Sequence, residues 1–250
     1  MATTTIAPSD TALSFDRVGM TYADGTHALD DVTFSVGHGE LASVVGPSGC
    51  GKSTLLRIAS GLAPCTAGAV AVDRSRLGYV FQDPTLLPWR SVQANVELLA
   101  ELDGVPKEER RRLAAAAIEL VGLTGFERHV PKRLSGGMRM RVSLARALTL
   151  KPRVFLFDEP FGALDEITRQ RLNDELLRLF SGERFAGLFI THSVSEAVFL
   201  STRVLVMSTR PGRIVADIAV PFDHPRPPEL RFSAEFGRVA GEVSAALREA

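Results

Sequence analysis

Residues 41–60 read Leu-Ala-Ser-Val-Val-Gly-Pro-Ser-Gly-Cys-Gly-Lys-Ser-Thr-Leu-Leu-Arg-Ile-Ala-Ser, and this segment carries the most specific local pattern of the chain. Its first five residues are nearly all apolar, which is the pattern of a β-strand covered on both faces. A glycine-rich loop follows, and a helical pattern runs from Ser53 to Ser60. Strand, tight loop and helix in direct succession are the local context of a phosphate-binding site.

The loop from Gly46 to Ser53 matches the pattern Gly-x-x-x-x-Gly-Lys-Ser. In such a loop, successive backbone N–H groups form an anion cradle at the N-terminus of the following helix. We expect Lys52 to reach the β- and γ-phosphates of a nucleoside triphosphate, and the Ser53 hydroxyl to bind Mg²⁺. The predicted nucleotide-binding residues in this segment are Gly46, Pro47, Ser48, Gly49, Cys50, Gly51, Lys52, Ser53 and Thr54.

Cys50 stands between two glycines of the loop. We interpret it as a small residue at a position where only the backbone matters, with no redox role. Because it lies within the cradle, alkylation of its thiol is expected to block nucleotide binding, and bound nucleotide is expected to protect it.

Strand and helix patterns alternate around this loop. Two β-rich runs, 13–18 and 32–36, flank the turn signal Asp24-Gly25 and predict an antiparallel beginning. Later strand patterns, separated by helical patterns at 166–179 and 194–200, lie at 154–157, 188–190 and 204–207. This alternation predicts a mostly parallel core sheet.

A long helical stretch separates the phosphate loop from the later strands. We predict a helical subdomain at about 90–148, inserted into one domain that spans 13–220. The segment 221–250 is rich in proline and then helical, and we expect it to be an appendage that either packs on the domain or regulates it.

Composition narrows the functional classes. The 250 residues include 29 basic and 29 acidic side chains, so the chain lacks the global positive field that attracts nucleic acid or anionic lipid. No run of 18 apolar residues and no leader-like pattern in Met1–Asp10 is present, and the two cysteines fit a reducing compartment. We expect an unexported protein in the cytoplasm.

An acidic pair, Asp158-Glu159, ends the apolar strand pattern Val154–Phe157. Carboxylates at the C-terminal end of a strand lie where open α/β sheets bind ligands. We expect Asp158 to hold Mg²⁺ and Glu159 to activate the attacking water. The simpler alternative is an Asp-Glu-Pro helix start, since acids and proline favour the first helical turn.

The segment Leu134-Ser-Gly-Gly-Met138 precedes another helical pattern and predicts a second anion site at a helix N-terminus. Here the sequence resembles the ATP-binding subunits of ABC transporters, and the resemblance covers residues 13–220. It implies an α/β P-loop NTPase with a mostly parallel core sheet, an N-terminal antiparallel β part and a helical insertion. It also implies a head-to-tail dimer of two copies, in which Ser135, Gly136 and Gly137 of one protomer meet the ATP held by the other.

Further marks of this family occur in the expected order. The resemblance implies that Tyr22 stacks on adenine, Gln82 senses Mg²⁺, and His192 contacts the γ-phosphate and orients Glu159 and the water; Ala163-Leu-Asp165 follows the acidic pair. Taken singly, a Tyr, a Gln or a His more often has only a packing or local hydrogen-bonding role. Met138 replaces the usual Gln, and the loop between Val72 and Leu77 is short; neither is expected to abolish ATP hydrolysis.

The segments 82–96, 138–141, 158–169 and 208–214 look like those of the nitrate/sulfonate/taurine-type importers. That resemblance implies a transmembrane permease as partner, a periplasmic or lipoprotein solute receptor as an indirect partner, and a place on the cytoplasmic face of the membrane. Apolar Leu86, Leu87 and Trp89 form either a small satellite core or a groove for a permease helix. The rival function is a soluble ABC-type ATPase acting on nucleic acid or ribosomes, against which the zero net charge argues.

Overall fold

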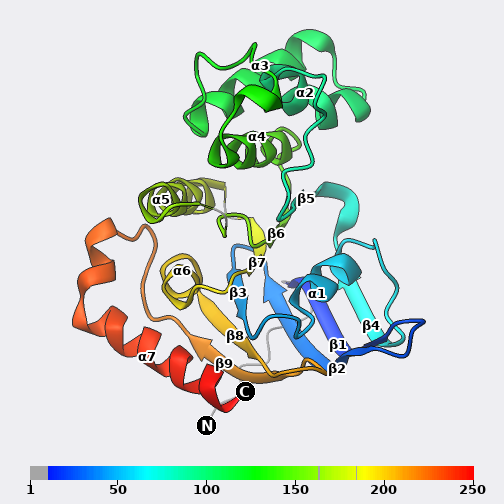
Figure 1. Ribbon diagram of the computed structural model, residues 1–250, viewed down its shortest axis with the longest axis vertical. Helices are drawn as coiled ribbons and strands as arrows, with labels where there is room; N and C mark the ends of the chain where they lie inside the picture. The colour runs from blue at the N-terminus through cyan, green and yellow to red at the C-terminus, as the bar shows by residue number, and fades with distance from the viewer. Residues whose placement is uncertain (1–10, 163, 184) are drawn as a thin grey trace.

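The computed structural model describes residues 11–162, 164–183 and 185–250. Met1–Asp10, the segment without a leader-like pattern, and Ala163 lie outside these ranges. The described chain forms a core with two β-sheets, and a group of three helices lies at one end of it (Figure 1). Among the described residues, no helix combines the length and the apolar character needed to cross a membrane.

The smaller sheet is antiparallel and has the strand order β2-β1-β4. It contains β1 (Thr11–Thr21), β2 (His27–Gly37) and β4 (Ala67–Val72). The predicted Asp24-Gly25 turn joins β1 to β2: Gly25 has a φ of 84°, and the Thr26 N–H donates to Asp24 Oδ1 at 2.9 Å. This turn and the following strand place Tyr22 and Ala28 beside the phosphate loop.

The larger sheet has the strand order β5-β6-β7-β3-β8-β9. Parallel pairing joins β5 (Leu77–Val80), β6 (Val154–Asp158), β7 (Ala186–Ile190), β3 (Leu41–Val45) and β8 (Arg203–Met207), while β9 (Ile214–Ala219) pairs antiparallel with β8. Every residue of β3, β6 and β7 is buried, as their continuous apolar runs predict. The predicted mostly parallel sheet is confirmed.

The two faces of this sheet belong to two hydrophobic clusters. Along β6, Leu156 packs with α1 (Lys52–Ala59) and the small sheet, whereas Phe155 and Phe157 pack with α5 (Glu166–Glu183) and α6 (Val194–Leu200). This alternation follows from the two-residue period of side chains along a strand. Helices on both faces therefore hold the carboxyl ends of β3, β6 and β7 in fixed positions.

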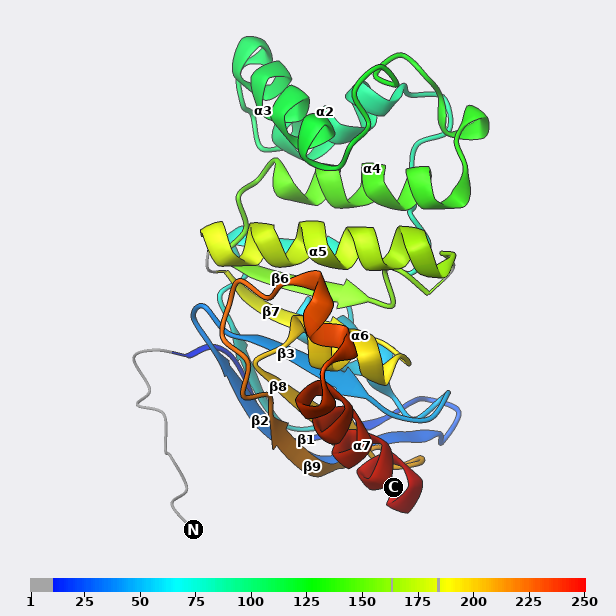
Figure 2. The ribbon, with the colours of Figure 1, turned by 90° about the vertical axis from the view of Figure 1, so that its left-hand side faces the viewer.

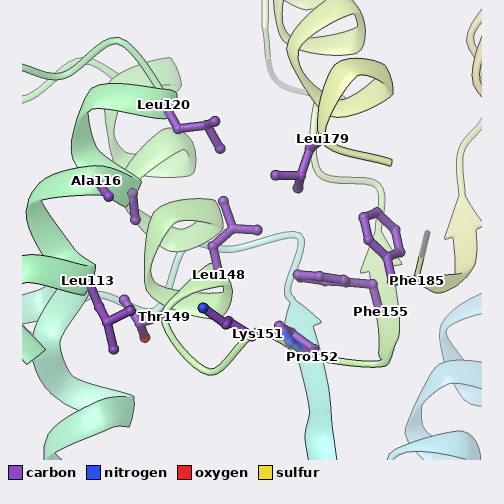
Figure 3. A pocket seen from close by; sticks show the side chains of 11 residues that line it. Leu113, Ala116, Leu120, Leu148, Thr149, Lys151, Pro152, Phe155, Leu179 and Phe185 are labelled. Carbon is purple, nitrogen blue, oxygen red and sulfur yellow. The ribbon is translucent and has the colours of Figure 1, made fainter. Parts of the chain in front are cut away.

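The helical subdomain comprises α2 (Val92–Leu102), α3 (Lys107–Leu120) and α4 (Gly136–Leu148). Ser91 and Ser135 cap α2 and α4, each accepting a hydrogen bond at 3.2 Å from the N–H three residues on. Between this subdomain and the core lies a cavity of about 170 Å³. Figure 3 shows its apolar walls, which include Leu148 from the end of α4 and Phe155 from β6.

The C-terminal segment packs against the core and does not project as an appendage. Helix α7 (Ala234–Glu249) buries Phe236, Val239 and Val243 in the same hydrophobic cluster as α5 and α6. The segment before it lies beside α6 in Figures 1 and 2, and there the buried Arg226 donates to the carbonyls of Val198, Phe199 and Ser201 at 2.8–3.0 Å. The Arg226 guanidinium thus satisfies the last carbonyls of α6.

Candidate nucleotide-binding site

The phosphate loop borders a polar cavity of about 390 Å³ at the carboxyl end of β3. Predicted residues from four separate parts of the sequence meet there: Tyr22, Ser48, Gly49, Gly51, Lys52, Ser53, Thr54, Gln82 and Glu159. The Tyr22 hydroxyl lies 3.0 Å from Thr54 Oγ1, which ties the end of β1 to the first turn of α1. The fold therefore brings most of the expected nucleotide-binding residues to one place.

Backbone conformation explains the glycines of the loop. Gly49 and Gly51 have φ values of 77° and 108°, and a Cβ on Gly51 would lie 2.8 Å from the Ala28 carbonyl oxygen. The Lys52 ammonium donates to the carbonyls of Gly46 and Pro47 at 2.8 and 2.9 Å, so it closes the loop on itself. Gly46, Pro47 and Cys50 do not line the cavity with the other loop residues.

The expectation about Cys50 alkylation needs correction. The side chain of Cys50 is 1% exposed and packs in the hydrophobic cluster beneath the loop, and its sulfur lies 3.9 Å from Lys52 Nζ. Because the folded loop shields the thiol, we expect slow alkylation of Cys50 even without nucleotide.

Ser53, which lines the cavity, is hydrogen-bonded to the buried Asp158. The Ser53 hydroxyl donates to Asp158 Oδ1 at 3.0 Å, and the Tyr79 hydroxyl donates to Asp158 Oδ2 at 3.5 Å. Burial raises the pKa of Asp158 above its ordinary value, and the Ser53 hydrogen bond partly offsets this. A hydroxyl and a buried carboxylate side by side, next to a phosphate cradle, are the hard oxygen ligands that Mg²⁺ prefers. The residues present therefore fit a magnesium ion.

Glu159 and His192 meet because they follow neighbouring strands. Asp158 at the end of β6 pairs with Ile190 at the end of β7, and the Glu159 N–H donates to the Ile190 carbonyl at 3.0 Å. Glu159 adopts a left-handed conformation with a φ of 44°, and its Oε2 lies 3.2 Å from His192 Nδ1. A carboxylate held by an imidazole at the edge of a phosphate cavity can accept a proton from a water.

The predicted second anion site lies elsewhere on the chain. Ser135, Gly136 and Gly137 stand at the N-terminus of α4, and none of them lines the cavity of the phosphate loop. Ser135 and Gly136 are exposed, and a Cβ on Gly136 would meet nothing within 4 Å. Within one chain, the structure does not bring these residues to the phosphate loop.

The apolar loop after Gln82 is hydrogen-bonded to the buried Asn95 side chain, while Trp89 in the same loop is exposed. The Asn95 side chain accepts from the Leu87 N–H at 2.8 Å and donates to the carbonyls of Leu87, Arg90 and Ser91. Leu86 packs against the core, but Trp89 is 75% exposed. Trp89 is therefore not part of a satellite core.

Sequence reasoning missed three residues that line the cavity: Thr26, Ala28 and Arg210. Arg210 lies in the turn between β8 and β9 and donates from Nε and Nη2 to the Gly49 carbonyl at 3.2 and 3.1 Å. The segment 208–214 was singled out only as a family resemblance. Nothing in its composition shows that the turn reaches the phosphate loop 161 residues away in sequence.

Comparisons with known proteins identify the family. The family model described as ABC transporter matches residues 29–162. The chain belongs to the ABC transporter family. Similar proteins are the taurine import ATP-binding protein TauB of Yersinia pestis, 44% identical over 79% of this chain and 80% of that protein, and the nitrate import ATP-binding protein NrtD of Synechococcus elongatus, 42% identical over 89% of this chain and 88% of that protein.

A solved structure supports the same assignment. The dimeric ATP-binding cassette MJ0796 in a post-hydrolysis state, bound to ADP and Pi, superposes with a TM-score of 0.75 at 30% identity. The match covers 84% of this chain and all of that one. The predicted family and the predicted P-loop fold are confirmed, and the chain is an ATP-binding ATPase of the ABC family.

Proposed function

We propose that the chain is the ATPase subunit of an ABC importer, working as a head-to-tail dimer of two copies bound to a transmembrane permease. The observation that carries the dimer is the separation of the Ser135–Gly137 signature from the phosphate loop of its own chain. Exposed N–H groups at a helix N-terminus suit an anion, and in this proposal the anion is the γ-phosphate held by the other protomer.

In each composite site, Lys52 and the phosphate loop hold the triphosphate of ATP. Ser53 and Asp158, with Gln82 on the cavity wall, would hold Mg²⁺, which neutralises phosphate charge when bound. Glu159 accepts a proton from the attacking water. The oxygen of that water bonds to the γ-phosphorus as the bond from the γ-phosphorus to ADP breaks. His192 keeps the Glu159 carboxylate directed at that water. Tyr22 borders the side of the cavity proposed for adenine.

The importer assignment rests on the relatives named for taurine and nitrate import. We propose a small solute such as nitrate, a sulfonate or taurine, delivered by a periplasmic or lipoprotein receptor to the permease. The ATPase then lies on the cytoplasmic face of the membrane through its permease. The exposed Trp89 is a suitable anchor for a permease helix, since aromatic residues are enriched at the centre of interfaces.

Complementation between two inactive variants tests the composite site. Gly136→Ala damages the signature but meets no atom of its own chain, while Lys52→Ala damages the phosphate loop. We expect each variant alone to fold and to lack turnover. Mixed dimers contain one intact site, made from the phosphate loop of one variant and the signature of the other, so ATPase activity should return on mixing. No recovery in mixtures shown by tag capture to contain both variants would refute the dimer.

Purification from native membranes tests the importer. A tagged chain should capture a multi-spanning permease in mild detergent. Capture of only ribosomal or nucleic-acid-bound proteins, together with stimulation of the ATPase by nucleic acid, would instead support the rival function.

A further inference from the structure

The turn between β8 and β9 lies against the phosphate loop. Its residue Gly212 is hydrogen-bonded twice to β2: the Gly212 N–H donates to the Ala28 carbonyl at 3.0 Å, and the Gly212 carbonyl accepts from the Asp30 N–H at 3.1 Å. Arg213 forms an ion pair with Asp30. The two backbone hydrogen bonds of Gly212 fasten the turn to β2 and fix where the side chain of Arg210 begins, whereas the ion pair of Arg213 is largely solvent-exposed and adds little to this attachment.

Arg210 reaches the phosphate loop from this turn. Its Nε and Nη2 donate to the Gly49 carbonyl, and its side chain lines the same cavity as Lys52 and Glu159. A guanidinium carries five N–H donors, so three remain after these two bonds. Among the described residues, none of those three has a hydrogen-bond partner, and no carboxylate lies within 4 Å of them.

Charge around the cavity favours an anion at Arg210. Asp24 is an acid whose pKa responds to Arg210: this pKa is held below its ordinary value mainly by the Thr26 hydrogen bond and to a smaller extent by the Arg210 charge. Asp24 is exposed and already accepts from the Thr26 N–H, so it does not neutralise Arg210. A planar cation with free donors, fixed beside a phosphate cradle, is suited to a phosphate oxygen.

We propose that Arg210 is a nucleotide-binding residue: its guanidinium braces Gly49 and gives its free N–H groups to the phosphates of the bound nucleotide. This inference rests on the phosphate loop being the ATP site, but not on the dimer or the permease. It assigns a role to the segment 208–214, which the proposed hydrolysis mechanism leaves unused.

Affinity measurements on the full chain test the proposal without turnover. Titration calorimetry with ADP and with AMP would compare the wild type with Arg210→Gln and Arg210→Lys. Loss of a charge-assisted hydrogen bond to phosphate should weaken ADP binding about tenfold or more in Arg210→Gln. The affinity for AMP, which has one phosphate, should fall less than the affinity for ADP in Arg210→Gln. Arg210→Lys keeps the charge but loses the planar set of donors, so its loss of ADP affinity should be clearly smaller than that of Arg210→Gln.

Arg213→Gln is the matched control. It removes a positive charge from the same turn, and Arg213 does not line the cavity. It should leave ADP affinity unchanged. Arg210 is exposed, so its variants should keep the wild-type melting temperature.

Three results would overturn the proposal. The first is ADP affinity in Arg210→Gln equal to that of the wild type. The second is an equal loss in Arg210→Lys and Arg210→Gln, which would mean that the residue only braces Gly49. The third is an equal loss in Arg213→Gln. Absence of ADP binding in the wild type would instead refute the assignment of the ATP site itself.

Discussion

Gly212 offers a sharp test of how the β8–β9 turn supports the nucleotide site. A Cβ added at Gly212 would lie 2.1 Å from the Cys50 carbonyl oxygen and 2.5 Å from Met207 Cε. Ordinary van der Waals contact begins at 3.4 Å, so the carbonyl and the Cβ must separate by about 1.3 Å. The Met207 side chain can move aside, but a backbone carbonyl can move only with its loop.

The phosphate loop is the part that must yield in Gly212→Ala. Gly212 is hydrogen-bonded on both sides to β2, whereas Cys50 lies between Gly49 and Gly51 in the cradle. A shift of about 1 Å misdirects several N–H groups at once, and misplacement of that size costs about 10²-fold in catalysis. We expect the Kd for ADP to rise at least about tenfold, and the free energy of unfolding to fall by about 1–3 kcal/mol through overpacking.

Calorimetry of ADP binding and of thermal unfolding would measure both effects. Gly241→Ala, in the interior of α7, is the matched control because its Cβ would meet nothing within 4 Å. That control should bind ADP normally and gain about 0.5–1 kcal/mol of stability, since alanine favours a helix over glycine. Wild-type affinity and stability in Gly212→Ala would refute the argument that this contact fixes the loop.

Three further outcomes follow from burial and charge. Asp158→Asn removes a buried carboxyl group whose pKa is raised in the folded state, and a raised acid pKa means that ionisation destabilises the fold as pH increases. Without nucleotide, the variant should therefore have a higher melting temperature than the wild type at pH 7, by about 2–4 °C for each kcal/mol gained. Below pH 3, where the carboxyl group is neutral, the two melting temperatures should be the same. An equal melting temperature at pH 7 would contradict this. Arg226→Ala should lose about 3 kcal/mol of stability by leaving buried carbonyls of α6 unpaired, whereas the exposed Arg238→Ala should lose less than about 0.5 kcal/mol in denaturant titration. Trp89→Ala should leave stability within about 0.5 kcal/mol while abolishing permease capture, and unchanged capture would exclude it as an anchor.

Local patterns predicted β1, β2, β3, β6, β7 and β8, the phosphate loop and the acidic pair Asp158-Glu159, because each depends on residues close in sequence; β4, β5 and β9 were not predicted. The apolar runs of β3 and β6 end directly before Gly46 and at Asp158, and parallel pairing brings such ends to one edge. The tail was harder to predict, because the burial of Phe236 and the capping of α6 by Arg226 depend on contacts between distant segments. The inward direction of the Cys50 thiol is likewise set by packing beneath the loop and is not visible in the motif.

The same limit explains why Arg210 was missed although its segment had been noticed. The position of Lys52 in the phosphate loop can be read from the sequence, because Lys52 directly follows the glycines. Arg210 reaches Gly49 only because β8 lies next to β3 in the sheet. A strand adjacent to the phosphate-loop strand ends at the same edge, so the turn that follows it lies near the nucleotide whatever its sequence. A basic side chain with free donors in that turn is therefore worth testing as a nucleotide ligand even where no motif names it, and Arg210→Gln makes that test in this chain.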